Sequence, residues 1–211
     1  MAGASQVLRQ YVGDLWTQYV RHPFVISLRD GTLPRDVFRY YLIQDAKYVT
    51  EMQRAVIRAS SLAPLDEAVE VINAVFANPE RGREVHERLY SALGVTESEV
   101  SSTGFNMVNY AYTRHLHYYA SQSWPLFLAA WAPCMWGYQE VGSFVRSTTD
   151  PVYREWAEFY ASEDYGRRVE AVLRVLDKYE VTPEMQRAFS NSVRFEIMFW
   201  EAALKKDPTS Y

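Results

Sequence analysis

A repeated signal for the start of a helix constrains the fold more than any other feature of this sequence. Three times a capping residue stands directly before a proline, at 78–79, 150–151 and 182–183. Asparagine, aspartate and threonine accept hydrogen bonds from the free N–H groups of a first helical turn, and proline fits the position that follows. Thr96 and Glu99 have the spacing of a capping box. The chain is therefore predicted to be a series of helices.

The spacing of apolar residues also predicts a helical fold. Between Pro34 and Ser60, core-type side chains recur every three or four residues, the period of one helix face. A first helix is predicted over Ser5–Tyr19. No alternating run of β-branched residues predicts a strand, and no repeat or linker divides the chain. We expect a single all-α domain, a helical bundle over residues 1–211, with a frayed tail at 205–211.

Composition excludes several classes of function. The chain has 22 basic and 26 acidic residues, a net charge of −4, which argues against nucleic acid or an anionic membrane as the main partner. A single cysteine cannot form an internal disulfide. No apolar run of about 18 residues could span a bilayer, and the first residues do not resemble a signal peptide. We therefore expect a cytoplasmic protein.

Two acidic side chains fall on apolar helix faces. Asp45 lies four residues after Tyr41 and three before Tyr48, and Glu196 shares a face with Phe199. A carboxylate in such a place loses its hydration unless other groups hydrogen-bond it. Each can be a structural acid held by neighbouring donors. Each can also be a functional group, because an apolar setting raises a carboxyl pKa towards the range of general acid–base catalysis.

The lone cysteine, Cys134, follows a proline within an apolar, helix-like stretch. Such a cysteine is most often a small buried side chain. Pro133 either kinks a helix or starts a new one, and a new start would place Cys134 where the helix dipole lowers a thiol pKa. Tyr138 lies one turn later and can reach the sulfur. No basic residue is close in sequence, so any activating charge must come from elsewhere in the fold.

Metal and phosphate sites have little support. His115 and His117 are two residues apart and point to different sides of a helix. No histidine has a glutamate three residues before it, so the Glu-x-x-His pairs of di-iron bundles are absent. There is no Gly-rich phosphate loop and no Gly-x-Ser-x-Gly elbow. We expect neither a metal nor a cofactor.

Over nearly its whole length the chain resembles the TenA family, also called thiaminase II or aminopyrimidine aminohydrolase. The segments that carry the resemblance are, in order, His22-Pro23-Phe24, Gly31-Thr32-Leu33, Tyr41-Leu42-x-Gln44-Asp45-x-x-Tyr48, Thr103-x(8)-Tyr112-Thr113, Pro133-Cys134-x-Trp136-x-Tyr138-x-Glu140-x-Gly142, Trp156-x-x-x-Tyr160 and Glu196-x-x-Phe199-Trp200. The ordered set is specific, and it implies a haem-oxygenase-like all-α fold.

The resemblance also implies a reaction, namely hydrolysis at the methylene carbon of an aminopyrimidine. Thiamine loses its thiazole or aminomethylpyrimidine loses ammonia, and hydroxymethylpyrimidine results, which would serve thiamine salvage. By position, Cys134 matches the nucleophile of the family's cysteine-bearing branch and Glu196 matches the acid/base. The other matched residues contact the pyrimidine (Asp45, Tyr138 and Tyr160) or support the cysteine with hydroxyl groups (Tyr48 and Tyr112).

Other functions stay open at this point. The main rival is a pyrimidine-binding or regulatory protein without turnover, although binding alone needs no nucleophile. Two other rivals explain Asp45, Cys134 and Glu196 less well. They are a metal oxygenase or quinone-forming oxidase on the same fold, and a purely structural helical protein. Family members are commonly homo-oligomers, above all tetramers. Three tryptophans could either pack across subunits or lie in the core (Trp124, Trp131 and Trp156).

Overall fold

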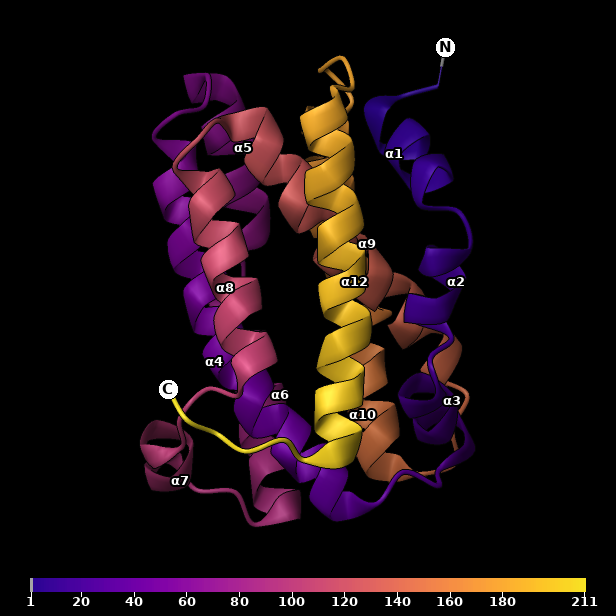
Figure 1. The fold of residues 1–211 in the computed structure, drawn as a ribbon. Coiled ribbons are helices and arrows are strands. Elements are labelled where there is room, and N and C mark those ends of the chain that lie inside the picture. Colours follow the sequence, from indigo (N-terminus) through magenta and orange to yellow (C-terminus); the bar gives the residue numbers. More distant parts are fainter. Residues whose placement is uncertain (1) are drawn as a thin grey trace.

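The computed structural model describes residues 2–211, which form a bundle of twelve helices with no strand in the described chain beyond one isolated bridge (Figure 1). The helices are α1 (Ala4–Val12), α2 (Asp14–Val20), α3 (Pro23–Asp30), α4 (Arg35–Ser60), α5 (Leu65–Val75), α6 (Pro79–Leu93), α7 (Glu97–Ser102), α8 (Met107–Ala120), α9 (Trp124–Val145), α10 (Pro151–Tyr160), α11 (Glu163–Leu176) and α12 (Pro183–Lys205). The all-α prediction is confirmed.

Several helices begin where local hydrogen-bond chemistry predicted. The Asp150 side chain accepts from the N–H groups of Val152 and Tyr153, and the Thr182 side chain accepts from the N–H of Met185. These bonds satisfy donors that have no partner inside the helix. Because such bonds reach only three residues along the chain, they could be predicted without any knowledge of the tertiary structure.

Other local predictions differ from the structure. The Thr96 hydroxyl accepts from the N–H of Glu99, but the Glu99 carboxylate pairs with Arg39 instead of completing the capping box. Asn78 makes no side-chain cap and adopts a left-handed backbone with φ of 49°. The helix predicted over Ser5–Tyr19 is divided into α1 and α2 by Gly13, whose φ of 51° is a conformation that glycine adopts without steric cost.

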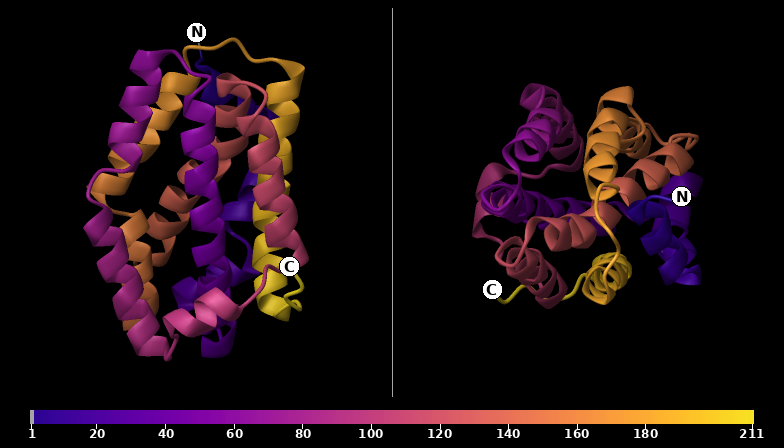
Figure 2. Two further views of the ribbon diagram at one scale, coloured as in Figure 1. Left: turned by 90° about the vertical axis from the view of Figure 1, so that its left-hand side faces the viewer. Right: turned by 90° about the horizontal axis from the view of Figure 1, so that it is seen from above.

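The helix that carries the cysteine is continuous through its proline. Pro133 lies inside α9, so the alternative of a new helix start is wrong, and Cys134 has no first-turn dipole beside it. Every residue from Phe127 to Tyr138 on α9 is buried. The helix packs against α8, α10, α11 and α12, which surround it in the view along the bundle (Figure 2). The three tryptophans are at most 1 % exposed and belong to the core of this chain (Trp124, Trp131 and Trp156).

The sequence predicts a frayed carboxyl-terminal tail, but in the structure this tail packs against the helices. The Ser210 N–H donates to the Phe105 carbonyl at 2.9 Å, and the ring of Tyr211 stacks on that of Tyr110 with centroids 4.3 Å apart. The Tyr40 hydroxyl donates to the Asp207 carbonyl at 2.6 Å. These partners lie about a hundred or more positions away in the sequence, so the short polar tail itself carried no signal of its docking.

None of the helices described over residues 2–211 is long and apolar enough to cross a membrane.

Candidate active site

A cavity of about 430 Å³ opens among α4, α6, α9, α10 and α11 and reaches inward to the cysteine. Five of the seven residues predicted for the site line it (Asp45, Tyr48, Cys134, Tyr138 and Tyr160). The other two, Tyr112 and Glu196, are buried but do not line the cavity. The fold therefore collects side chains from helices far apart in the sequence around one space, and its volume falls within the range of small-molecule pockets.

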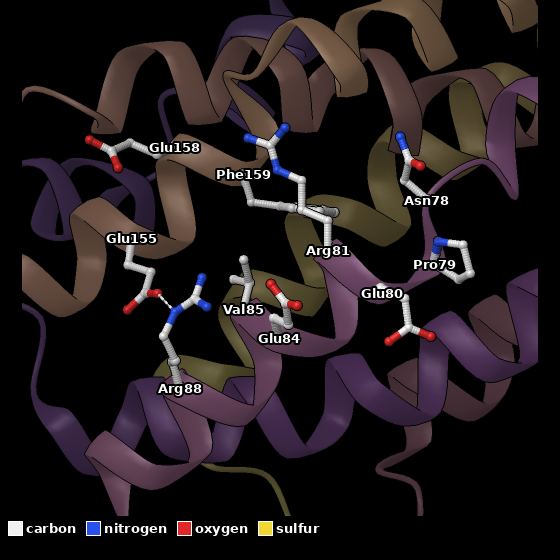
Figure 3. A pocket seen from close by; sticks show the side chains of 10 residues that line it. All are labelled: Asn78, Pro79, Glu80, Arg81, Glu84, Val85, Arg88, Glu155, Glu158 and Phe159. Carbon is white, nitrogen blue, oxygen red and sulfur yellow. Dashed lines mark hydrogen bonds and ion pairs between the residues drawn. The ribbon is translucent and has the colours of Figure 1, made fainter.

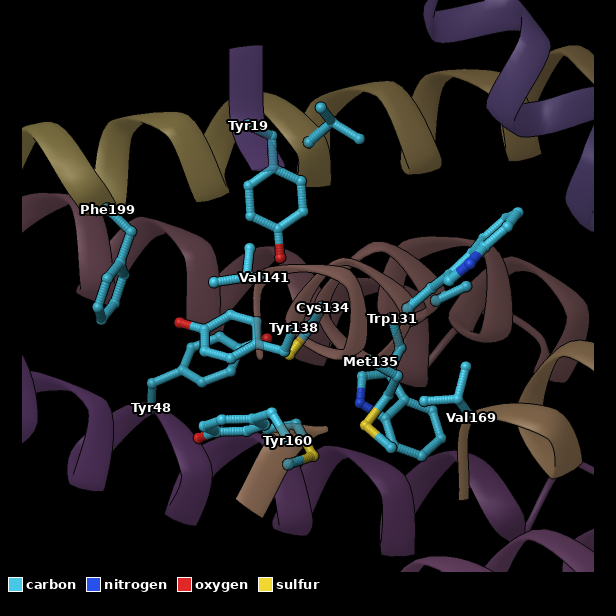
Figure 4. Packing of buried hydrophobic residues seen from close by; sticks show 14 of the residues in the cluster. Tyr19, Tyr48, Trp131, Cys134, Met135, Tyr138, Val141, Tyr160, Val169 and Phe199 are labelled. Carbon is cyan, nitrogen blue, oxygen red and sulfur yellow. The ribbon is translucent and has the colours of Figure 1, made fainter. Parts of the chain in front are cut away.

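Cys134 stands at the inner end of the cavity and is 6 % exposed. Figure 4 shows its sulfur among the rings of Tyr48 and Tyr138. Burial, and next the negative charge of Glu196, raise the pKa of the thiol well above its usual value, whereas the neighbouring Tyr48 hydroxyl lowers it. The resting group is a thiol, because no helix terminus offsets its burial. Its use as a nucleophile needs a base close by.

Glu196 supplies a carboxyl group next to that thiol. It projects from α12, is 2 % exposed, and accepts a hydrogen bond from the Tyr112 hydroxyl at 2.7 Å. The pKa of Glu196 is raised to about 8, mainly by burial and also by the charge of Asp45, while the hydrogen bond from Tyr112 and the neighbouring Cys134 thiol oppose the rise. At neutral pH this group can therefore both give and take a proton, as general acid–base catalysis requires.

Asp45 presents a free carboxyl oxygen to the cavity. It is 3 % exposed on α4, and its Oδ2 atom has no hydrogen-bond partner in the described chain. Burial raises the pKa of Asp45 to about 7, while the hydroxyl of Tyr41 lowers it. The structural interpretation from the sequence needs a fully satisfied carboxylate, and the free oxygen does not fit it. An unpaired buried acceptor that lines a cavity fits a group awaiting a ligand.

Two tyrosines support the reactive groups in different ways. The resemblance gave Tyr48 and Tyr112 the same task, support of the cysteine. In the structure the Tyr112 hydroxyl donates to Glu196, while Tyr48 adjoins the thiol and its hydroxyl lacks a partner of good geometry. The two rings pack against each other with centroids 4.9 Å apart. Tyr112 therefore acts on the acid, and Tyr48 on the thiol.

Two further tyrosines form an aromatic wall. The ring centroids of Tyr138 and Tyr160 are 4.9 Å apart, and the hydroxyl of Tyr138 lies 3.0 Å from that of Tyr41. Aromatic faces with polar rims suit a flat heteroaromatic ring with exocyclic nitrogen groups. Tyr41 was recognised in the sequence only as a neighbour of Asp45, although its spacing of four residues already placed the two on one helix face.

Sequence reasoning missed Tyr19 and Tyr165. The Tyr165 hydroxyl lines the cavity and donates to the Met135 sulfur at 3.7 Å. The Tyr19 hydroxyl donates to the Pro133 carbonyl at 3.3 Å, and its ring lies against Gly137 so closely that an added Cβ would come within 2.1 Å of it. Gly137 in the middle of a helix was the one signal in the sequence for this close contact.

A wider hollow of about 660 Å³ lies on the surface between α6 and α10, but its chemistry differs (Figure 3). Arg88 pairs with Glu155 across it, and Arg81 pairs with Asp164. In this groove, which we call the α6/α10 groove, Arg81 and Arg88 are exposed and each pairs with an acidic side chain. It offers no buried reactive group.

No group of three or more potential metal ligands is found within residues 2–211. His115 and His117 point to different partners, as their spacing predicted. The Nε2 atom of His115 lies 2.8 Å from the Ser192 hydroxyl, and that of His117 lies 2.8 Å from the Glu51 carboxylate. Burial lowers the pKa of His115 to about 4, so its ring is neutral.

Comparisons with known proteins agree with the fold and with the family predicted from the sequence. The aminopyrimidine aminohydrolase of Bacillus subtilis is 28% identical over 213 residues, which cover 96% of this chain and 90% of that protein. A crystal structure of a TenA-like protein from Sulfolobus solfataricus is 50% identical, covers both chains completely and superposes with a TM-score of 0.96. A protein from Silicibacter described as a TenA family transcription regulator is 28% identical, with a TM-score of 0.85, over 95% of this chain and 96% of the other.

The model of the TENA/THI-4/PQQC family matches residues 9–206, almost the entire chain. The matched range contains Asp45, Cys134 and Glu196. By this match and by the shared helical structure, the chain belongs to the TENA/THI-4/PQQC family.

Proposed function

We propose that this protein is a hydrolase that acts at the methylene carbon of aminopyrimidines. Aminomethylpyrimidine would give ammonia and hydroxymethylpyrimidine, thiamine would lose its thiazole, and the role would be thiamine salvage. The observation that carries the proposal is one cavity lined by a buried thiol, a carboxyl group of raised pKa and an aromatic wall, with the second such carboxyl group, that of Glu196, buried beside the thiol. The name of the Bacillus subtilis relative supports the same activity.

The first step is attack by Cys134 on a carbon of the pyrimidine ring. With a pKa of about 8, roughly a tenth of Glu196 is ionised at pH 7, and that fraction can take the thiol proton as the bond between sulfur and carbon forms. Attack ends the aromaticity of the ring. The electron pair of the ring amino group can then expel the leaving group at the methylene carbon. Without this loss of aromaticity, water would attack the methylene carbon only very slowly.

The second step returns the enzyme to its starting state. Glu196 gives its proton to the departing amine, so ammonia leaves as the bond between nitrogen and the methylene carbon breaks. Water adds to the methylene carbon, the bond between sulfur and the ring carbon breaks, and the proton released by water restores the thiol. No electrons are gained or lost overall, so this sequence requires no redox partner.

Asp45 would orient the substrate. Its free Oδ2 can accept a hydrogen bond from the exocyclic amino group of the pyrimidine, while Tyr138 and Tyr160 hold the ring against the aromatic wall. A ring fixed in this way presents one carbon to the thiol and one substituent to the acid. The carboxylate and the wall thus account for the recognition of an aminopyrimidine, and the thiol and Glu196 account for its cleavage.

The direct test is incubation of the purified protein with aminomethylpyrimidine, with measurement of ammonia and hydroxymethylpyrimidine. We expect both products in equal amounts, with none from the Cys134→Ser variant. A parallel assay with thiamine, compared by kcat/KM, identifies the preferred substrate. If the protein binds hydroxymethylpyrimidine but converts neither compound, the hydrolase proposal is wrong.

That last outcome would support the second candidate, a pyrimidine-binding regulatory protein. The description of the Silicibacter relative favours it. Such a protein would use Asp45 and the aromatic wall alone, and the loss of the thiol in Cys134→Ser would leave its ligand affinity unchanged.

We also propose that the chain is a single domain that acts in the cytoplasm as a homo-oligomer, specifically a tetramer. The support is the family resemblance alone, because the three tryptophans considered for contacts between subunits lie in the core of this chain (Trp124, Trp131 and Trp156). Light scattering coupled to gel filtration gives the oligomeric state directly.

A further inference from the structure

One buried hydroxyl joins three helices directly behind the proposed site. Ser192 on α12 is fully buried, and its Oγ lies 2.5 Å from the carbonyl oxygen of Ala130 on α9. The same Oγ lies 2.8 Å from the Nε2 atom of His115 on α8. We call these three residues the Ser192 junction. None of them lines the cavity, and the proposed reaction steps use none of them.

Each member of the Ser192 junction stands about one helical turn from a reactive group. Ser192 precedes Glu196 by four residues on α12, and Ala130 precedes Cys134 by four on α9. His115 follows Tyr112, the donor to Glu196, by three residues on α8. Residues three or four apart share a helix face. The junction therefore links α8, α9 and α12 about one helical turn away from Tyr112, the thiol of Cys134 and the carboxyl group of Glu196.

The positions of the protons in the junction follow from its distances and burial. A carbonyl only accepts, so a separation of 2.5 Å requires the Ser192 hydroxyl to donate to Ala130. Its oxygen must then accept from Nε2–H of His115. Burial lowers the pKa of His115 to about 4, which leaves a neutral ring with a single N–H. In the junction, His115 therefore donates a hydrogen bond to Ser192, and Ser192 donates one to the carbonyl of Ala130.

The α9 backbone that accepts the hydrogen bond from Ser192 lacks one of its own helical hydrogen bonds. Pro133 has no N–H, so the carbonyl of Ala129 lacks its normal partner within α9. The next carbonyl, that of Ala130, faces the N–H of Cys134 in a regular helix. Ser192 bonds to that carbonyl from another helix. It therefore holds α9 in place at the turn where the proline removes a helical hydrogen bond.

We propose that Ser192 and His115 are positioning residues that set the place of the Cys134 thiol relative to the Glu196 carboxyl. The inference rests on the proposed function, since it gives the two groups a proton to exchange. Displacement of reacting groups by about 1 Å can lower a rate by about a hundredfold. Because neither residue borders the cavity, loss of the junction affects turnover and leaves ligand affinity nearly unchanged.

Three variants test the junction. Ser192→Ala removes the hydroxyl, His115→Leu removes the ring donor, and His115→Gln places an amide N–H near the former Nε2 position. We expect Ser192→Ala to lower kcat by roughly ten- to a hundredfold with KM changed less than about threefold. His115→Leu should lower kcat less, and His115→Gln should restore most of that loss.

The control is Tyr153→Phe, which removes another buried hydroxyl that donates to a carbonyl across the fold, that of Leu33. Tyr153 borders neither the cavity nor the junction. We expect it to lower the melting temperature as much as Ser192→Ala does while leaving kcat within about twofold. If both variants lower kcat in proportion to stability, or if His115→Gln is no better than His115→Leu, the positioning role is wrong.

A second readout does not depend on turnover. Cys134 is the single cysteine of the chain, so the rate of alkylation by iodoacetamide reports its reactivity alone. We expect Ser192→Ala to change that rate and its dependence on pH severalfold, whereas Tyr153→Phe leaves both unchanged. Unchanged alkylation in Ser192→Ala overturns the inference even in an active enzyme. Absence of ammonia release by the wild type, with the expected alkylation changes, contradicts the proposed function and leaves the junction supported.

Discussion

The cavity interior and the α6/α10 groove place the same residue types in opposite surroundings. In the groove, Glu155 pairs with Arg88, and both side chains are substantially exposed (Figure 3). Asp45, which lines the cavity, and Glu196, beside the cavity's thiol, are almost completely buried, and neither forms an ion pair within residues 2–211. Burial raises their pKa values to about 7 and about 8. The comparison teaches that desolvation without a matched charge, rather than the size of a hollow, marks the reactive site.

The difference extends to the aromatic residues. Tyrosines surround the buried acids and contact them through hydroxyl groups, as Tyr112 does with Glu196. Guanidinium groups surround the exposed acids. A hydroxyl holds a carboxyl in place while leaving its proton available at neutral pH, whereas a guanidinium favours the ionised form. Substitutions in the two regions should therefore differ by orders of magnitude in their effect on turnover.

The largest effect is expected for Cys134→Ser. Loss of the thiol nucleophile should lower kcat by roughly a thousandfold or more, because the covalent route is closed. Folding and the binding of hydroxymethylpyrimidine should persist, since serine is close in size. Circular dichroism and calorimetric titration with the product check both points. Turnover close to that of the wild type would exclude the covalent mechanism.

Glu196→Gln should lower kcat by roughly a hundred- to ten-thousandfold, the range for loss of a general acid–base group. Product affinity should change far less. In the wild type, kcat should rise as the pH rises through about 8, because the ionised carboxylate that takes the thiol proton then becomes the major form. A pH–rate profile of the variant should lack this limb, and retention of the limb would assign it to another group.

Asp45→Asn should act mainly on binding. The ring amino group loses a charged acceptor, and a hydrogen bond to a charged group contributes about 1.5–3 kcal/mol, or roughly ten- to a hundredfold in affinity. We expect KM and the product dissociation constant to rise by that factor, with a smaller change in kcat. Equal loss in kcat with unchanged KM would instead make Asp45 part of the chemistry.

The buried acids should also make stability depend on pH. Both folded pKa values lie above the ordinary values near 4, so the folded state binds more protons than the unfolded state between about pH 4 and pH 8. Their contribution to stability is complete at low pH and is lost as the pH rises through this window. Melting temperatures of the wild type should therefore fall, relative to those of the Asp45→Asn/Glu196→Gln double variant, from pH 5 to pH 8. A constant difference between the two would contradict the raised pKa values.

The smallest effect is expected in the α6/α10 groove. Arg88→Ala breaks an exposed ion pair with Glu155, which typically contributes about 0–1 kcal/mol. We expect kcat and KM within about twofold of the wild type and a melting temperature lowered by no more than a few degrees. A large loss of turnover would show that the groove takes part in the reaction.

Much of the fold could be predicted because its signals act over short distances. The helix starts at Asp150 and Thr182 depend on bonds that reach two or three residues. The course of α9 through Pro133 could not be predicted from local signals, because the helix continues where it is packed among several other helices. Docking of Tyr211 on Tyr110 likewise joins residues that are distant in sequence.

The candidate site divides in the same way. By itself, the sequence determined the helical class, several helix starts, and the presence of Asp45, Cys134 and Glu196 in the order of the family's motifs. The tertiary structure alone decided that Asp45 and Cys134 line one cavity, that Tyr112 donates to Glu196, and that an oxygen of Asp45 has no partner in the described chain. The physical reason is the distance along the sequence over which each interaction acts. Capping involves one helical turn, whereas the desolvation of a group depends on every helix packed around it.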